Sequence, residues 1–153
     1  MRYWTIHTSV LEDSVCTLPG SGYVSCTEFI EWIKGKGNEG VALDNNRIII
    51  TEYKNLQKDR SMRVSGIVGG FLKSILTTHN KSLPFSSELQ SNHETTLKNN
   101  GANEKDLIYF GVAANSNKVF AHSKNFTNAI NNSVEQLLGV KIHYVPDKTW
   151  RTL

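Results

Sequence analysis

The sequence predicts a three-layer α/β/α sandwich with a mainly parallel central sheet. Short apolar segments rich in β-forming residues alternate along the chain with longer segments in which apolar residues recur every three or four positions. Strands that alternate with helices in this way form a parallel sheet with helices on both faces. The chain has 153 residues, of which 39% are hydrophobic, so it can bury one core without disulfides or a structural metal. We therefore expect one domain over residues 1–153.

Two strands and a helix are expected in the N-terminal part of the chain. Strands are predicted at Tyr3 to Ile6, which ends in the polar turn His7-Thr8-Ser9, and at Val41 to Leu43. Between them, a helix that begins near Ser25 places Cys26 on its apolar face. This position favours a packing role for the thiol. The chain has two cysteines, too few for a disulfide framework, so we expect reduced thiols.

Two further helices are predicted after the second strand. Residues Ile48 to Gln57 include three consecutive isoleucines, which by propensity alone favour a strand. We interpret the segment as a helix because its apolar residues share one helical face and Asp44 begins a segment of N-cap chemistry ahead of it. A helix from about Val64 to Thr77 follows, and its Gly69-Gly70 pair indicates a close backbone contact.

The second half of the chain begins with a polar stretch. Residues 79–103 are rich in Ser, Asn and Lys and include the turn signal Asn100-Gly101, so we expect a surface insertion or mobile segment there. The alternation of elements then resumes. Helices are expected from about Glu104 to Ala114 and Thr127 to Leu138, and strands at Lys118 to Ala121 and Val140 to Val145.

Five polar residues are expected near one edge of this sheet. In an open parallel sheet, ligands bind outside the carboxyl ends of the strands, where the connections diverge to opposite faces. His7 follows the first strand, Glu52 lies on the helix after the second, and Asp106 opens a later helix. Ser123 and Asn125 follow the next strand. Oxygen ligands at such a place can hold Mg²⁺ or Mn²⁺, which activates water and neutralises charge on a cleaved phosphate.

Six segments occur in an order and spacing that together carry a family resemblance. They are Ile6-His7-Thr8-Ser9-Val10-Leu11, Val41-Ala42-Leu43-Asp44 with Arg47-Ile48, Glu52-Tyr53-Lys54-Asn55-Leu56, Gly69-Gly70-Phe71-Leu72-Lys73, Asp106-Leu107-Ile108-Tyr109-Phe110-Gly111-Val112-Ala113, and Phe120-Ala121-His122-Ser123-Lys124-Asn125-Phe126. Each motif is loose alone, but their order resembles that of PIN-like domains, a family of metal-dependent nucleases. The resemblance spans nearly the whole chain except residues 79–101. It implies a Mg- or Mn-dependent endoribonuclease.

The resemblance also implies a depleted acidic site. His7 stands where the family has its first aspartate, and Ser123 and Asn125 stand where acids usually follow the fourth strand. Glu52 and Asp106 remain as the implied catalytic and metal-binding carboxylates, with His7, Ser123 or Asn125 completing the shell. Two carboxylates hold a hard cation less strongly than three or four. Imidazole suits Mn²⁺ or a later transition metal better than Mg²⁺.

Each of the five residues also has a structural interpretation. Glu52 fits a solvated helix residue that pairs with a nearby lysine. Asp106 fits a first-turn residue that the helix dipole favours. His7 fits a hydrogen-bonded turn residue, and Ser123 and Asn125 fit ordinary turn formers. The sequence leaves both sets of roles open.

Three functions are compatible with these features. The first is a PIN-like nuclease that acts on RNA, weakened or inactive through the missing acids. The second is a catalytically dead PIN-like module that binds nucleic acid or a protein partner, since a fold can persist without its reaction. The third is a toxin-like or defence-system subunit whose missing groups come from another chain, either a different protein or a second copy.

Charge and hydropathy bear on the partners and the location. The formal net charge of +3 is compatible with binding to a polyanion, RNA rather than DNA on the family resemblance. The apolar runs are too short to cross a bilayer, so we expect no membrane partner. The first residues lack the apolar stretch of a secretory signal, which predicts a cytoplasmic location.

Overall fold

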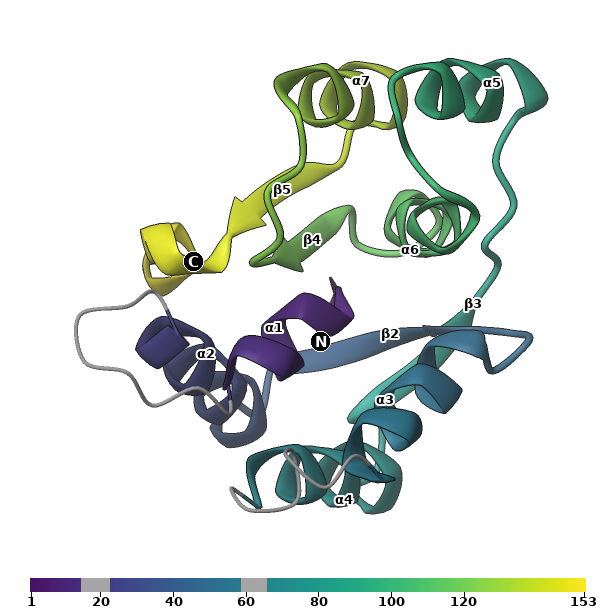
Figure 1. The fold of residues 1–153 in the computed structure, drawn as a ribbon. Coiled ribbons are helices and arrows are strands. Elements are labelled where there is room, and N and C mark those ends of the chain that lie inside the picture. The colour runs from purple at the N-terminus through teal and green to yellow at the C-terminus, as the bar shows by residue number, and fades with distance from the viewer. Residues whose placement is uncertain (15–22, 59–65) are drawn as a thin grey trace.

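The computed structural model describes residues 1–14, 23–58 and 66–153 (Figure 1). The strands are β1 (Arg2–Ile6), β2 (Glu39–Asp44), β3 (Ser82–Phe85), β4 (Val119–His122) and β5 (Lys141–Tyr144). The helices are α1 (Thr8–Ser14), α2 (Tyr23–Gly35), α3 (Ile48–Lys58), α4 (Ile67–Thr77), α5 (Ser91–Asn99), α6 (Glu104–Ala114) and α7 (Asn128–Leu138). Two short 3₁₀ helices follow, at Val145–Asp147 and Thr149–Thr152.

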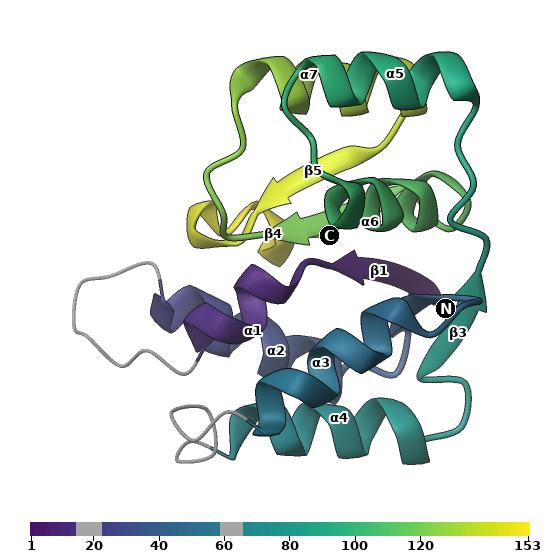
Figure 2. The same cartoon turned by 45° about the vertical axis from the view of Figure 1, so that its right-hand side comes forward.

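The five strands form one sheet in the order β3-β2-β1-β4-β5, and every neighbouring pair is parallel. Helices α1 to α4 lie on one side of the sheet and α5 to α7 on the other (Figures 1 and 2). The predicted three-layer α/β/α sandwich with a parallel sheet is therefore confirmed. No helix within the described ranges combines the length and the apolar character that a membrane crossing requires.

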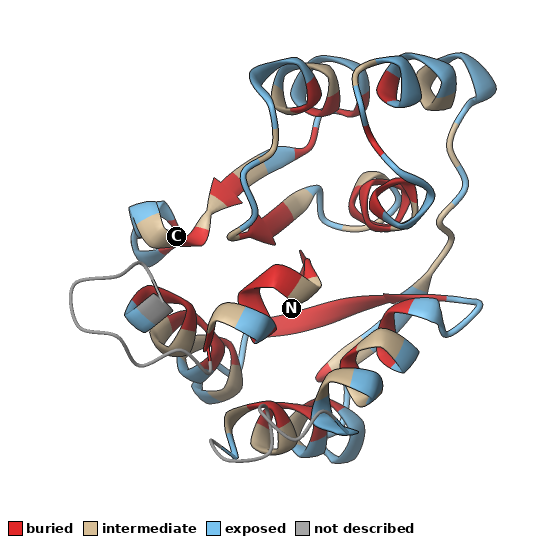
Figure 3. Ribbon diagram, in the orientation of Figure 1, coloured by how far each residue is buried: buried red, intermediate tan, exposed pale blue. Residues whose placement is uncertain are grey.

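The core lies between the sheet and the inward sides of the helices, where the buried residues gather (Figure 3). On the α1–α4 side, Trp4 of β1 packs edge-on against Phe29 and Trp32 of α2, with ring centroids 5.3 and 5.9 Å apart. Trp150 from the C-terminal 3₁₀ helix packs against the same two rings at 5.3 and 5.4 Å. Aromatic burial of this kind stabilises the sandwich beyond the area that it removes from water.

Helix α3 confirms the interpretation of the three isoleucines as helical. The carboxylate of Asp44, at the end of β2, accepts hydrogen bonds from the backbone N–H groups of Ile48 and Ile49 at 3.0 and 2.7 Å. These donors have no partner inside the helix, so the cap satisfies them. Ile49, Ile50 and Tyr53 face the core, which explains why burial overrides the strand propensity of the run.

The structure corrects two local predictions. Residues 79–103 are not an irregular insertion, because they contain the edge strand β3 and helix α5. The strand has exposed Leu83 and Pro84, and a proline and a short polar context hide an edge strand from pattern analysis. The turn expected at His7-Thr8-Ser9 is also wrong, because α1 begins at Thr8.

Cys26 has the packing role that was predicted. It is a free thiol with no exposed surface in the core, and burial raises its pKa to about 12. A thiol with this pKa is not a nucleophile at neutral pH. Cys16 and the first residues of the helix expected from Val64 lie outside the described residues.

Candidate functional site at the ends of strands β1 and β4

The central strands β1 and β4 end side by side. His7 follows β1, and its backbone N–H donates to the carbonyl of Ala121 in β4 at 2.9 Å. From β1 the chain continues toward β2, whereas β4 lies on the other side and leads to β5. The connections therefore diverge between these two strands, and ligands of open parallel sheets bind at such a point. Of the five predicted site residues, His7 and Ser123 lie directly at this point.

His7 is held by hydrogen bonds on both ring nitrogens. The backbone N–H of Ser9 donates to Nδ1 at 3.1 Å, and the Ser9 hydroxyl lies 2.8 Å from the same atom. Because Nδ1 accepts, the proton of the neutral ring is on Nε2. This Nε2 lies 3.4 Å from Oδ1 of Asp106. His7 is therefore the hydrogen-bonded residue of one alternative and also the direct neighbour of a predicted metal ligand.

Asp106 lies in the first turn of α6 and borders the site. Its carboxylate and the side chain of Asn103 form a reciprocal capping box at the start of α6. Its Oδ2 also lies 3.7 Å from the amine of Lys124, which follows β4. Burial alone would raise the pKa of Asp106, but the hydrogen bonds from His7 and Asn103 and the charge of Lys124 lower it overall. The carboxylate is therefore ionised and compensated within the chain.

Glu52 reaches the same place from α3. Its Oε2 accepts a hydrogen bond from the hydroxyl of Tyr109 at 2.7 Å, and the ring of Tyr109 packs on His7 with centroids 4.9 Å apart. Its Oε1 lies 3.6 Å from the exposed amine of Lys105 but is buried and lacks a hydrogen-bond partner among the described residues. Glu52 thus pairs with a lysine of another helix, and one of its oxygens still lacks a donor.

Glu12 and Asp13 belong to this site although the sequence analysis did not identify them. Burial raises the pKa of the Glu12 carboxyl and the negative charges of Asp13 and Glu52 add to this, against the opposing effect of His7 and Lys124. They were missed because α1 was not predicted. A signal was present, since Val10, Leu11 and Ser14 are buried at helical spacing.

Ser123 and Asn125 take different places. The hydroxyl of Ser123 contacts the carbonyl of Ser9 at 2.9 Å and also the carboxylate of Asp13. Its backbone N–H donates to the Ser9 hydroxyl at 3.0 Å, so Ser123 fastens α1 to the end of β4. Asn125 is exposed and lines a neighbouring pocket instead. The structure therefore brings four of the five predicted residues together and leaves Asn125 outside.

We call this group the His7 cluster, which consists of His7, Glu12, Glu52, Asp106, Tyr109 and Lys124. It combines three carboxylates from three helices with one amine and one imidazole. Within the described ranges, no group of three or more His, Cys, Asp or Glu side chains is arranged to hold a metal ion. The cluster places the positive charge of Lys124 near Asp106.

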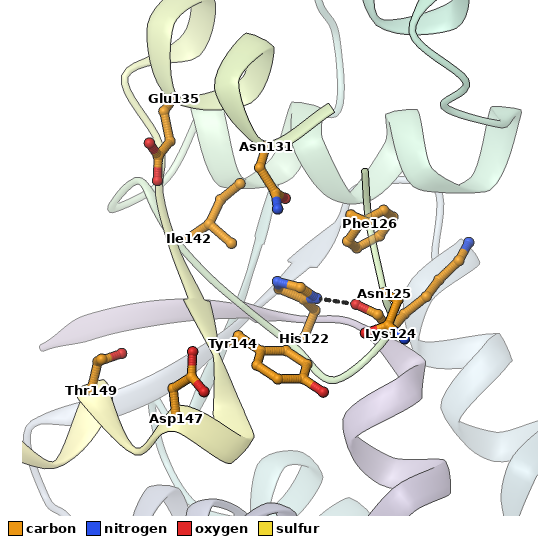
Figure 4. A pocket seen from close by; sticks show the side chains of 10 residues that line it. All are labelled: His122, Lys124, Asn125, Phe126, Asn131, Glu135, Ile142, Tyr144, Asp147 and Thr149. Atoms are coloured by element: carbon orange, nitrogen blue, oxygen red, sulfur yellow. Dashed lines mark hydrogen bonds between the residues drawn. The ribbon is translucent and has the colours of Figure 1, made fainter. Parts of the chain in front are cut away.

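A pocket of about 350 Å³ lies beside the cluster, at the carboxyl ends of β4 and β5 (Figure 4). His122, at the end of β4, points into it, and Lys124 and Asn125 form part of its wall. Lys124 therefore belongs to both places. We call this cavity the His122 pocket.

Comparisons with protein-family models, with curated proteins and with solved structures gave no match. The resemblance to PIN-like domains therefore rests on the order of the motifs, and it enters below as a proposal.

Proposed function

We propose that this chain is a PIN-like nuclease with a weak Mg²⁺ or Mn²⁺ site that cleaves RNA. The observation that carries the proposal is Oε1 of Glu52, a buried carboxylate oxygen without a hydrogen-bond donor. The negative charge of Glu52 also acts on Glu12, because it contributes to the raised pKa of the Glu12 carboxyl. A buried carboxylate oxygen without a hydrogen bond is costly, the amine of Lys105 at 3.6 Å offsets this only at long range, and a cation would satisfy both carboxylates.

The chemistry of the side chains fits a hard divalent ion. Glu12, Glu52 and Asp106 supply carboxylate oxygens, the ligands that Mg²⁺ and Mn²⁺ prefer. The ion, when bound, would activate water and neutralise charge on the phosphate. Lys124 and Lys105 place amines beside the carboxylates, where they would attract the RNA backbone.

The same contacts explain why the site should be weak. One oxygen of Asp106 is taken by His7, and the other lies near Lys124 and accepts from the backbone of Asn103. A metal that binds Asp106 must displace or share these partners. His7 thus compensates the charge of Asp106 at the position where the family resemblance implies an additional acid.

A second function is favoured because Asp106 already has partners within the chain, in His7 and Lys124. If Asp106 keeps its partners, the domain would bind RNA or a protein partner without cleaving it. A toxin-like or defence-system subunit of this type would depend on another chain for the missing ligands. The two functions differ in whether a divalent ion binds at Glu52.

Cleavage of a labelled single-stranded RNA with Mn²⁺ or Mg²⁺ tests the nuclease. We expect Glu52→Gln and Glu12→Gln to lower the metal-dependent rate about tenfold or more, because each removes a ligand charge. Glu31→Gln is the matched control, since Glu31 is exposed on α2 and pairs only with Lys34 among the described contacts. Unchanged cleavage in Glu52→Gln would exclude this residue from the mechanism.

Replacement of His7 separates the two functions. We expect His7→Asp to add a ligand charge, to free Asp106 and to increase Mn²⁺-dependent cleavage. If neither the wild type nor His7→Asp cleaves RNA, yet RNA binds with an affinity that falls steeply with salt, the binding module is the correct function. Absence of both cleavage and salt-dependent binding would exclude RNA as the partner.

A further inference from the structure

The His122 pocket contains a buried histidine whose orientation is fixed. Only 3% of His122 is exposed. Its ring lies parallel to Phe120 at 5.7 Å and packs against Phe126 at 5.0 Å and Tyr144 at 5.4 Å. Three aromatic neighbours leave the imidazole little freedom to rotate. Its two nitrogens therefore point in defined directions.

These directions determine what the ring offers to a ligand. Nδ1 lies 2.7 Å from the backbone carbonyl of Lys124. A carbonyl only accepts, so Nδ1 carries the proton. Burial lowers the pKa of His122 to about 4, and the ring is neutral at physiological pH. Nε2 is consequently a hydrogen-bond acceptor, and it points into the pocket on the side of Asn131 and Ile142 (Figure 4).

Both His122 and Asn131 have buried acceptors without a partner in the pocket. Nε2 of His122 and Oδ1 of Asn131 are buried and make no hydrogen bond within the part of the chain that the structure describes. Groups of this kind cost free energy unless something satisfies them. The carboxylates of Glu135 and Asp147 also line the pocket. The pocket thus offers two buried acceptors and two exposed carboxylates, whereas the amine of Lys124 points away from His122 (Figure 4) and lies 3.7 Å from Oδ2 of Asp106.

Part of the lining between these acceptors is aromatic or aliphatic, and the rest is polar. Phe126, Ile142 and Tyr144 line the cavity, and the amine of Lys124 lies 5.0 Å from the centre of the Phe126 ring. The volume of about 350 Å³ lies in the range of pockets that bind small molecules. A planar molecule with several N–H groups along its edge suits both the walls and the acceptors.

We propose that the His122 pocket binds a guanine base. Guanine presents a ring N–H and an adjacent amino group on one edge, and these donors match the imidazole nitrogen and a carboxylate. Its faces would pack on the rings of Phe126 and Tyr144, which line the pocket. This site goes beyond the proposed nuclease, because it requires neither a metal nor catalysis.

The other bases fit this set of acceptors less well. Adenine and cytosine carry an amino group next to a ring nitrogen that is itself an acceptor, and that nitrogen would face the acceptors of the pocket. Uracil has one N–H between two carbonyls, which would lie against the same groups. A site built from acceptors discriminates strongly against a ligand that lacks the matching donors.

Calorimetric titration of the full chain with 5′-GMP, AMP, CMP and UMP tests the proposal. We expect saturable binding of GMP, about tenfold or more tighter than binding of the other three. The imidazole nitrogen signal of His122, followed by NMR, should shift with the same saturation curve. Absence of saturable GMP binding, or equal affinity for all four nucleotides, would overturn the proposal.

Variants at the bottom and the rim of the pocket locate the site. His122→Phe should abolish GMP binding, and Asp147→Asn, at an exposed residue that does not affect the core, should weaken it about tenfold. Glu31→Gln on α2 is the control that should leave binding unchanged. GMP affinity that is unaffected in folded His122→Phe and in Asp147→Asn would place the ligand elsewhere and refute the site.

A final comparison identifies the source of the base. A short single-stranded RNA with one guanine should compete with GMP if the pocket accepts a base within a strand, and the same RNA without guanine should not compete. If GMP binds but neither RNA competes with it, the site accepts free nucleotides and not a base within a strand. Equal competition by both RNAs would show that guanine is not the determinant, and the proposal would fail.

Discussion

His7 and His122 end neighbouring strands, yet the two histidines have opposite surroundings. Both nitrogens of His7 have partners, in Ser9 on one side and Asp106 on the other. His122 has one partner, the carbonyl of Lys124, and its second nitrogen is buried without one. The first histidine closes a network of charges, whereas the second leaves an acceptor open inside a pocket.

The contrast teaches that burial alone does not define a binding site. His7 is 8% exposed and His122 is 3% exposed, so accessibility does not separate them. What separates them is whether the chain itself satisfies the buried polar atom. In the His7 cluster, the buried polar atom without a hydrogen-bond partner among the described residues is Oε1 of Glu52, not a nitrogen of His7. Both proposed sites therefore begin at a buried polar atom that lacks a hydrogen-bond partner among the described residues.

The largest effect is expected from a variant that breaks both regions at once. Helix α6 supports both, because Asp106 and Tyr109 contact His7 while Phe110 packs on the rings beside His122. A Cβ on Gly111 would lie 1.9 Å from the carbonyl oxygen of Ser87. We expect Gly111→Ala to lower the free energy of unfolding by about 3 kcal/mol or more, as measured by urea denaturation.

Gly35→Ala, at the end of α2, is the control for this substitution. A Cβ at Gly35 meets nothing within 4 Å, so this substitution should change the unfolding free energy by less than about 1 kcal/mol. A stable Gly111→Ala variant that alters only one of the two regions would show that α6 does not couple them.

The second prediction concerns the contribution of His122 to the pH dependence of stability. The pKa of His122 falls from 6.5 to about 4 on folding, chiefly through burial. Between these values the unfolded chain binds more protons, so stability rises with pH and is fully present above 6.5. The shift corresponds to about 3 kcal/mol. His122→Phe should reduce the rise in unfolding free energy between pH 4 and 7, and an unchanged rise would contradict the buried neutral ring.

Much of the fold follows from the sequence, and the misses have local causes. The parallel sheet and the helix at 104–114 were predicted from the period of the apolar residues, and the structure adds the Asn103–Asp106 capping box at the start of this helix. The edge strand β3 was missed because burial there is slight and Pro84 argues against a strand. Pattern analysis detects segments that bury a face, and this edge buries little.

The site was harder to predict than the fold. Strand ends identified His7 and Ser123, but only the folded structure reveals that the Tyr109 hydroxyl of α6 reaches Glu52 of α3. The role of Glu12 required a helix that was not predicted. The open acceptor of His122 depends on which nitrogen meets the carbonyl of Lys124. Such facts depend on rotamers and tautomers, which a single sequence does not encode locally.

The third prediction tests how much the contacts of Asp106 with His7, Lys124 and Asn103 stabilise the chain. Asp106→Ala removes the carboxylate half of the capping box of α6 and leaves His7 and Lys124 without their shared partner. We expect a loss of about 2 kcal/mol in unfolding free energy. Asp106→Asn keeps a capping oxygen and should lose less. Its pKa is lowered in the folded state, so the wild-type contribution is present at neutral pH and disappears as the pH falls through the folded value. Equal losses in the two variants would show that charge is unimportant there.

The smallest effect is expected from Glu12, whose replacement should stabilise the chain rather than destabilise it. Its pKa is raised by folding, so the folded chain binds more protons than the unfolded chain, and stability falls as the pH rises toward neutral. Glu12→Gln should therefore stabilise the chain at pH 7, by less than about 1 kcal/mol because the residue is exposed.

Mn²⁺ provides the decisive comparison. An ion that binds Glu12 and Glu52 should raise the melting temperature of the wild type and not that of Glu12→Gln, whereas the same rise in both would place the ion away from the His7 cluster.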